Sequence, residues 1–517
     1  MMTEKETTKG LPWLGWLVVV LTAVMASVWS LNKVLNQDEI FSLQTDRVAS
    51  LGEVLRIQSD YPISLEAPPY HVLSHAAIKL LGPTAYALRL PSLLGFLLLQ
   101  VCLYFFVRNM AGERSGLVAM AIPGVSAVLF YAAEGRPYGL LLGACALTVL
   151  CWQIASRRGE AGEPRVLPLL GVALALALTL TVHFYGVLVL IPLCGAELIR
   201  SYTRRQLDKP MLVAIIVGMA SLGTTLPYVK ASKEFKKHYY SGVISPHMMT
   251  QPYRQMLIDY TKYPHAVQTV LMLLLVLAAA VVAWGCMRAV REKRVGISAA
   301  DATLLLLLGM LPIFAFVLGR VVTHALEPRH SFAAVVAVVS LIAIGISGWL
   351  RKSSVFYGVM AVLLVGIVLV NASRAREFGA EGRALLDALK LTPEQRAAVD
   401  AQADRNIYFQ DLGQWEFASQ YEPDPALKSR LVLVYSLEEE MSRRNHDTMY
   451  LTAIHTMKFS NQPITSYDEL RKQPGPHVFA VFHSGWSWTD DAFREEAAEV
   501  KPMGEAFSGD LEQVRFK

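Results

Sequence analysis

The chain has 517 residues, of which 53% are hydrophobic and only 18% are charged, and its mean hydropathy is +0.37. Ordinary soluble domains carry about 25% charged residues, so this composition excludes a purely soluble enzyme, a disordered chain and a collagen. Division at Asn371 separates an apolar first part, with a net charge of +12, from an acidic tail with a net charge of −7. All five cysteines lie in the apolar part and form no CxxC pattern, which excludes a disulfide scaffold as well.

The first part of the chain is a succession of long apolar segments. Stretches of roughly 18–23 apolar residues are long enough to cross a bilayer. The candidate segments, eleven in all, are residues 11–31, 88–108, 115–131, 136–155, 166–182, 184–200, 211–229, 266–287, 302–322, 329–349 and 354–371. The sequence therefore predicts an α-helical polytopic membrane protein with about eleven transmembrane helices.

The short connections between these segments indicate the topology. Every second connection is basic, as the positive-inside bias requires. The basic residues are Lys5, Lys9, Arg108, Arg114, Arg157, Arg158, Arg165, Arg200, Arg204, Arg205, Lys209, Arg288, Arg291, Lys293, Arg294, Arg351 and Lys352. We expect a plasma (inner) membrane protein with a cytoplasmic N-terminus, and an odd number of spans puts the tail on the extracytoplasmic side. Because the basic residues lie in separate short loops, no nucleic-acid partner is expected.

Two domains are expected, a membrane domain over residues 1–371 and an extracytoplasmic α/β domain over residues 372–517. The first outer loop, residues 32–87, contains amphipathic segments typical of helices that lie on a membrane surface. In the tail, Thr392 precedes a proline and predicts the start of a helix. Short β-like runs alternate there with helical stretches, which is typical of an α/β domain. The runs cover residues 406–410, 431–435, 477–483 and 512–516, and the helical stretches cover 377–404, 413–420 and 491–498.

Four clusters of polar residues fall at the predicted outer face, where ionisable groups are costly. They comprise Asp38 and Glu39 after the first span; Glu66 before the paired prolines 68 and 69; Glu134, Arg136 and Tyr138; and His183 and Tyr185 with His324, Glu327, Arg329 and His330. Each has a structural alternative: solvated loop charges, an ordinary helix start, a buried Glu–Arg ion pair or a structural histidine. Arginine is also the side chain best shaped to clamp a phosphate.

A polar cavity with carboxylates and cations at one membrane face fits sugar transfer from a lipid phosphate. One carboxylate would act as the base that deprotonates an acceptor hydroxyl. Cations would hold the leaving phosphate, which departs without an acid catalyst. The long polyprenyl tail of such a donor explains why the enzyme is embedded in lipid.

In this order the motifs resemble those of the GT-C superfamily of polytopic glycosyltransferases. The resemblance is to the dolichyl-phosphate-mannose protein mannosyltransferases and to bacterial relatives such as the lipid A aminoarabinose transferase. The matching segments are Asp38-Glu39, Glu66-Ala-Pro-Pro-Tyr-His71, Ala87-Leu-Arg-Leu-Pro-Ser92, Glu134-Gly-Arg-Pro-Tyr138, Val182-His-Phe-Tyr185 and Pro328-Arg-His330. The resemblance covers residues 11–371. Two departures are Ala67, where many relatives have His, and His330, where the usual residue is Tyr.

The resemblance implies an inverting glycosyltransferase that moves a sugar from a polyprenyl-phosphate donor to a hydroxyl of a glycan, lipid or protein acceptor at the extracytoplasmic face. Asp38 would be the general base, and Glu39 and Glu66 would orient the acceptor or bind a divalent metal. Glu66 and His183 are the metal candidates, and no other cofactor is expected. The residues expected around the donor phosphate are Arg136, Tyr138, His183, Arg329 and Lys230.

Three alternatives remain from the sequence. They are another GT-C activity such as a polysaccharide ligase or polymerase, a transporter of lipid or solute, and a scaffold whose exported tail binds partners. Transporters show inverted repeats and polar residues near the bilayer midplane. This sequence has no internal repeat and its charges cluster at one face, which favours the transferase. A scaffold would leave the charges near the membrane unexplained.

Overall fold

The computed structural model describes residues 12–64, 66–238, 243–257, 264–402 and 404–517. The chain forms two compact units. The first unit comprises residues 1–31, 66–226 and 241–375, and the second comprises residues 32–65, 227–240 and 376–517. Lys5, Lys9 and parts of the predicted outer loop 230–265 lie outside the described residues.

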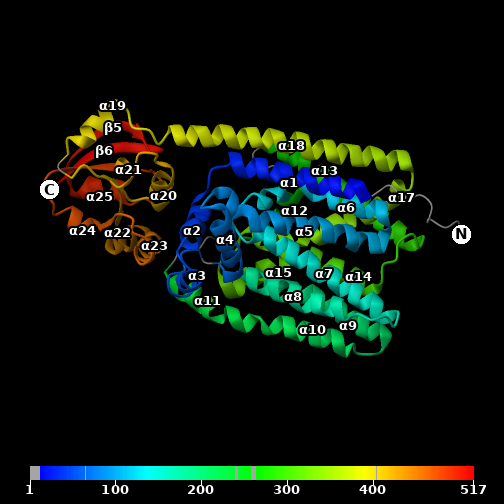
Figure 1. The fold of residues 1–517 in the computed structure, drawn as a ribbon. Helices are drawn as coiled ribbons and strands as arrows, with labels where there is room; N and C mark the ends of the chain where they lie inside the picture. The colour runs from blue at the N-terminus through cyan, green and yellow to red at the C-terminus, as the bar shows by residue number, and fades with distance from the viewer. Residues whose placement is uncertain (1–11, 65, 239–242, 258–263, 403) are drawn as a thin grey trace. The chain divides into compact units, whose positions relative to one another are not determined.

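The first unit is helical, because backbone polar groups inside a bilayer must be satisfied within each segment. Its long helices lie side by side (Figure 1). Its elements are α1 (Pro12–Asn32), α4 (Pro68–Leu81), α5 (Ala85–Ala111), α6 (Glu113–Val125), η1 (Ala127–Ala132), α7 (Tyr138–Glu160), α8 (Val166–Val182), η2 (Phe184–Val189), α9 (Leu190–Arg204), α10 (Lys209–Ala220), η3 (Pro246–Met249), α12 (Gln251–Leu257), α13 (His265–Arg291), α14 (Ala299–Gly309), α15 (Leu311–Leu318), η4 (Gly319–Thr323), η5 (Pro328–Ala334), α16 (Val335–Gly345) and α17 (Ser347–Leu350). Helices α11 (Leu222–Phe235) and α18 (Ser353–Asp387) each contribute residues to both units.

Within the described ranges, eight helical stretches are long and apolar enough to cross a membrane. They are α1, α5, α7, η2 with α9, α10 with α11, α13, η5 with α16, and α18. The pair formed by α14 and α15, bent by 49°, brings the number to nine if it is one span. The predicted number of eleven is not confirmed, because α6 has only 13 residues and α8 has 17. The chain is a multi-pass membrane protein, and its orientation stays a prediction.

Helices α5 and α7 pack closely through glycines. A Cβ added at Gly143 would collide with the backbone of Gly95, and one added at Gly139 would collide with the carbonyl of Ser92. Small residues permit this close approach between membrane helices. The contact fixes the beginning of α7, which is where Arg136 and Tyr138 lie.

A buried network of charges joins α7, α9 and the start of α10. Arg200 Nη2 lies 2.8 Å from Glu197 Oε1 and 2.5 Å from Asp208 Oδ2. Trp152 Nε1 donates a hydrogen bond to Glu197 Oε2 at 3.1 Å, and Arg165 also pairs with Asp208. Buried charges need partners of this kind, so the network fixes the relative positions of these three helices.

The second unit contains a six-stranded sheet with the order β3-β2-β1-β4-β6-β5. Strands β3, β2, β1 and β4 are parallel, whereas β6 pairs antiparallel with both β4 and β5. The strands are β1 (Ile407–Phe409), β2 (Leu431–Tyr435), β3 (Ile464–Ser466), β4 (Pro476–Val481), β5 (Ala497–Ala506) and β6 (Gly509–Phe516). The predicted C-terminal α/β fold is confirmed. Strands β3 and β5 were not predicted, because their side chains are largely half-buried or exposed and lack an apolar run.

Helices cover the sheet, and the parallel strands β1, β2 and β4 are buried on both faces, as such sheets require. Phe409 and Leu433 belong to one core and Tyr408 and Val432 to the other, following the alternation of side chains along a strand. The helices are α2 (Gln37–Asp46), α3 (Leu51–Asp60), α19 (Pro393–Asp400), α20 (Leu412–Tyr421), α21 (Pro425–Lys428), α22 (Leu437–Arg444), α23 (Thr448–Met457), α24 (Tyr467–Leu470) and α25 (Thr489–Glu496).

Two details of the second unit concern predicted segments. Thr392 caps α19 through a reciprocal capping box with Gln395, so the predicted helix start is confirmed. Helix α18 ends at Asp387 and α19 begins at Pro393, so the predicted helix 377–404 is in fact two helices. Phe41 of α2 belongs to the same core as Phe409. Residues 32–65, predicted as part of the first outer loop, therefore pack with the C-terminal sheet.

Candidate active site

Glu66 lies just before helix α4 in the first unit. Ala67 is extended, with φ −87° and ψ 148°, as a residue before proline prefers, and the two prolines form the first turn of α4. Glu66 Oε1 lies 2.5 Å from Arg136 Nε, and Glu66 Oε2 lies 3.2 Å from His71 Nε2. All three side chains are buried. The carboxylate therefore fixes the Arg136 guanidinium, and His71, which the sequence analysis left without a role, is its second partner.

Arg136 and Tyr138 lie at the beginning of α7, in the turn that follows η1. Ser92 of α5 donates a hydrogen bond to the Arg136 carbonyl oxygen, which ties this turn to the neighbouring helix. The Cζ atom of Arg329, on η5, lies 5.5 Å from the centre of the Tyr138 ring, and the ring centres of His183 and Tyr138 are 5.2 Å apart. The structure thus brings four of the five predicted phosphate-binding residues into one cluster.

Histidine and tyrosine rings extend this cluster. His183 ends α8 with an extended backbone, and its Nδ1 accepts a hydrogen bond from the Tyr185 backbone N–H at 3.1 Å. The His330 ring stacks on Tyr185 at 4.3 Å and lies 5.4 Å from the His183 ring. The other two members of the predicted fourth cluster have different surroundings: His324 is exposed, and Glu327 caps η5.

The predicted metal candidates, Glu66 and His183, do not belong to a group of metal-binding side chains among the described residues. Glu66 already pairs with Arg136, and the positive charge of that guanidinium opposes binding of a second cation at the same carboxylate. Over the residues that the structure describes, no group of three or more His, Cys, Asp or Glu side chains could hold a metal ion. No step of the chemistry is therefore assigned to a metal.

Asp38 and Glu39 lie in the first turn of α2, in the second unit, and their surroundings differ. Glu39 is fully buried, and its Oε2 accepts a hydrogen bond from the Asn36 backbone N–H at 3.1 Å and pairs with Lys33 Nζ at 3.1 Å. Asn36 in turn accepts a hydrogen bond from the Glu39 backbone N–H, which completes a capping box. Asp38 is half-buried, so it is the carboxylate of this pair that a substrate can reach.

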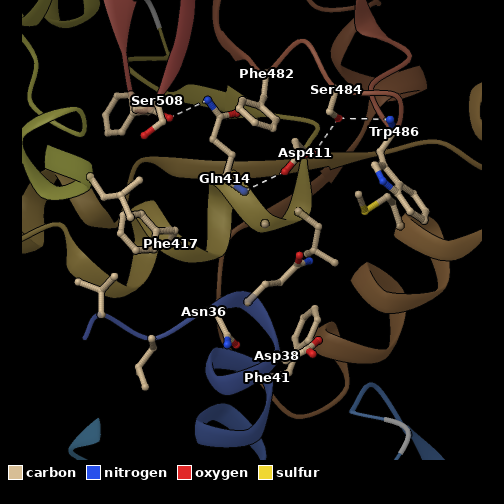
Figure 2. A pocket seen from close by; sticks show the side chains of 18 of the residues that line it. Asn36, Asp38, Phe41, Asp411, Gln414, Phe417, Phe482, Ser484, Trp486 and Ser508 are labelled. Atoms are coloured by element: carbon tan, nitrogen blue, oxygen red, sulfur yellow. Dashed lines mark hydrogen bonds between the residues drawn. The ribbon is translucent and has the colours of Figure 1, made fainter. Parts of the chain in front are cut away.

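Asp38 lines a cavity of about 650 Å³ that is formed within the second unit. Figure 2 shows Asn36, Asp38 and Phe41 of α2 opposite side chains of the C-terminal sheet domain. The opposite wall includes Asp411, Gln414, Phe417, Phe482, Ser484, Trp486 and Ser508. The sequence analysis assigned none of these residues to a site, because they come from three separate stretches of the tail.

Glu416 of α20 is a fully buried acid beneath α2. Burial raises the pKa of Glu416 well above its ordinary value, the charge of Asp38 raises it further, and a hydrogen bond with Gln44 and the charge of Arg47 oppose the rise. An acid in these surroundings favours its neutral form.

Lys230, the fifth predicted phosphate residue, lies on α11 within the second unit and is exposed. The candidate residues thus divide between the units. Glu66, Arg136, Tyr138, His183 and Arg329 belong to the first unit, and Asp38, Glu39 and Lys230 belong to the second.

The fold is the GT-C fold of membrane glycosyltransferases, and the model of a family of such enzymes matches part of the chain. Residues 66–228, about a third of the chain, match the family model of dolichyl-phosphate-mannose-protein mannosyltransferase. The matched segment contains Glu66, Arg136, Tyr138 and His183. The resemblance predicted from the sequence is confirmed, and a search of curated protein sequences found no match.

Two solved structures of one protein share the fold over nearly the whole chain. The chain is similar to ArnT from Cupriavidus metallidurans, with a TM-score of 0.56 to the structure bound to undecaprenyl phosphate and 0.59 to the apo structure. In both comparisons the identity is 13%, and the match covers 97% of this chain and 98% of that chain. An oligosaccharyltransferase from Archaeoglobus fulgidus matches with a TM-score of 0.45 at 12% identity, over 78% of this chain and 61% of that chain.

Proposed function

We propose that this protein transfers a sugar from a polyprenyl-phosphate-linked donor to an acceptor hydroxyl at the extracytoplasmic face of the plasma (inner) membrane. The observation that carries the proposal is the cluster of Arg136, Tyr138, His183 and Arg329, most of it within the segment that matches the family model. In it Arg136 is buried against the Glu66 carboxylate, and Arg329 and His183 lie against the Tyr138 ring. The polyprenyl part of the donor is supported by the similar fold of ArnT, which was solved with undecaprenyl phosphate.

In this proposal the cluster binds the phosphate of the donor. The guanidinium groups of Arg136 and Arg329 supply the positive charge, and planar guanidinium groups match phosphate oxygens in pairs. Glu66, which also pairs with His71, holds Arg136 in place. When the bond between the anomeric carbon and the phosphate oxygen breaks, the phosphate leaves with the electron pair, and fixed cations stabilise that charge.

Asp38 is the general base of the proposed reaction. Its carboxylate takes the proton of the acceptor hydroxyl while the hydroxyl oxygen attacks the anomeric carbon. Because this is a single displacement from the side opposite the phosphate, the configuration at the anomeric carbon is inverted. Glu39 does not contact the acceptor in this proposal, because its carboxylate caps α2 and pairs with Lys33.

The test uses purified full-length protein in lipid nanodiscs, with a radiolabelled polyprenyl-phosphate sugar and a cell-envelope extract as the source of acceptors. Asp38→Asn should lower the turnover by at least about 100-fold, because general-base catalysis is removed, while donor binding is kept. Arg136→Ala should weaken donor binding about tenfold or more, because a charged hydrogen-bond partner of the phosphate is lost. The control is Asp60→Asn, which changes an exposed carboxylate at the end of α3.

Two results contradict the proposal. Normal turnover by a folded Asp38→Asn variant would remove Asp38 as the base. Unchanged donor affinity in Arg136→Ala would remove the cluster as the phosphate site.

A further inference from the structure

The cavity beside Asp38 has a fixed far wall built by the C-terminal domain. Asp411 Oδ1 caps α20 by accepting a hydrogen bond from the Gln414 backbone N–H at 2.9 Å, and Ser484 Oγ donates to Asp411 Oδ2 at 3.3 Å. Gln414 Nε2 donates to the Phe507 carbonyl oxygen at 2.8 Å. The Trp486 backbone N–H donates to Ser484 Oγ at 3.2 Å (Figure 2). Side chains fixed in this way present a preformed surface to a ligand.

The cavity combines aromatic rings with polar groups. Phe482 is 40% exposed although it is a large apolar residue, and it lines the cavity together with Phe41 and Trp486. Amide, hydroxyl and carboxylate groups, such as those of Asn36, Ser508 and Asp411, also line it. Sugars have apolar faces of C–H groups and edges of hydroxyl groups, so rings and polar groups side by side suit them. The volume of about 650 Å³ falls within the range of small-ligand sites and fits two or three sugar rings.

The negative charge of the cavity favours uncharged sugars over anionic ones as its ligand. Three carboxylates line it, from Asp38, Glu381 and Asp411, and Lys33 is the lysine among the lining residues. Lys33 is paired with the buried Glu39, so it does not offset the three acids. A cavity with this charge opposes phosphorylated or carboxylated ligands.

We propose that this cavity binds the acceptor as an uncharged glycan, with the hydroxyl that receives the sugar beside Asp38. The proposal rests on the proposed function, and it assigns the C-terminal domain a role as the acceptor-binding domain. It follows from chemistry that the base and the acceptor hydroxyl belong to one site, since a base must reach the proton it removes. Phe482 and Trp486 would stack on the sugar rings and set the specificity.

The experiment measures binding of fluorescently labelled trisaccharides to full-length protein in nanodiscs. The neutral probes are maltotriose, mannotriose and chitotriose, and the anionic probe is trigalacturonic acid. We expect at least one neutral probe to bind and trigalacturonic acid to bind at least tenfold more weakly. Phe482→Ala and Trp486→Ala should each weaken binding of the neutral probe about tenfold, because an aromatic stacking surface is lost. The matched control is Leu437→Ala, at a residue that is 43% exposed and does not line the cavity.

Undecaprenyl phosphate binding is measured on the same samples, which separates this proposal from the proposed function. Undecaprenyl phosphate binding should be unchanged in Phe482→Ala and Trp486→Ala, which shows that these two variants are folded. The same binding should be lost in Arg136→Ala. If no neutral probe binds, or if the two aromatic variants bind it as well as the wild type, the cavity is not the glycan site. If a neutral glycan binds as expected but Arg136→Ala keeps its affinity for undecaprenyl phosphate, the cavity proposal stands and the donor site fails.

Discussion

Substitutions in the ion pair between Glu66 and Arg136 should affect the stability of the protein and its binding of the donor differently, so the two effects can be measured separately. The two side chains are only 4% and 8% exposed, and the Glu66 Oε1 and Arg136 Nε atoms are 2.5 Å apart. Loss of one partner from a buried pair costs about 3–5 kcal/mol, because the other charge is left uncompensated. We expect Arg136→Gln to lower the free energy of unfolding by about 3 kcal/mol, at the low end of this range, because His71 remains beside Glu66 and offsets part of the loss.

The double variant Glu66→Gln/Arg136→Gln removes both charges. It should therefore be more stable than the sum of the two single changes predicts, by about 1–3 kcal/mol. It should still bind undecaprenyl phosphate poorly, because the guanidinium is absent. The measurements are denaturant titrations in detergent micelles followed by tryptophan fluorescence, and binding of labelled undecaprenyl phosphate.

The control for this cycle is an exposed ion pair of the same type. Arg288 Nε lies 2.7 Å from Glu292 Oε1 on the surface, and Arg288→Gln should change the stability by no more than about 0.5 kcal/mol. A stability of Arg136→Gln equal to that of the wild type would show that the Glu66–Arg136 pair does not act as a buried ion pair. Recovery of phosphate binding in the double variant would show that the guanidinium does not hold the phosphate.

Three further predictions concern positions outside the proposed site. Gly143→Ala should cost about 1–3 kcal/mol because its Cβ would collide with the backbone of Gly95, and an unchanged melting temperature would argue against the close packing of α5 and α7. Asp208→Asn should cost about 3 kcal/mol because Arg200 and Arg165 lose a carboxylate, and normal resistance to proteolysis would contradict this. Burial raises the pKa of Glu440 from 4.5 to about 7, so its contribution to stability is fully present below about pH 4.5 and is lost as the pH rises through about 7. The protein should lose about 3 kcal/mol over this window, and Glu440→Gln should remove that pH dependence in unfolding titrations; an equal slope in both proteins would refute it.

The helical membrane fold could be predicted because long apolar runs have few other solutions in a bilayer. Each predicted segment contains helix, but the segment 115–131 forms the short α6 followed by η1, and 302–322 is bent between α14 and α15. Hydropathy measures how apolar a segment is, whereas helix breaks depend on packing against neighbours. The number of spans was therefore the weakest part of the prediction.

The candidate phosphate cluster could be predicted in part, because its members occur in short motifs whose charges are out of place in an apolar region. Glu66, Arg136 and His183 were found in this way. His71 was not, because a histidine one turn into α4 resembles an ordinary helix residue until its 3.2 Å contact with Glu66 is known. For Glu39, the sequence could not separate a site residue from a helix cap, since an acid three residues after Asn36 fits both.

The sequence by itself determined the class of the protein and the residues with the charges that the proposed chemistry needs. Apolar runs, basic loops and the motif order are properties of neighbouring residues, and they can be read without a fold. Only the tertiary structure decided which acid of the Asp38-Glu39 pair lines a cavity and which caps α2. It also decided that Phe482 and Trp486, more than 400 residues along the chain from Asp38, line the same cavity. Burial and contacts between distant segments arise when the sheet and α2 pack together, and no local pattern records them.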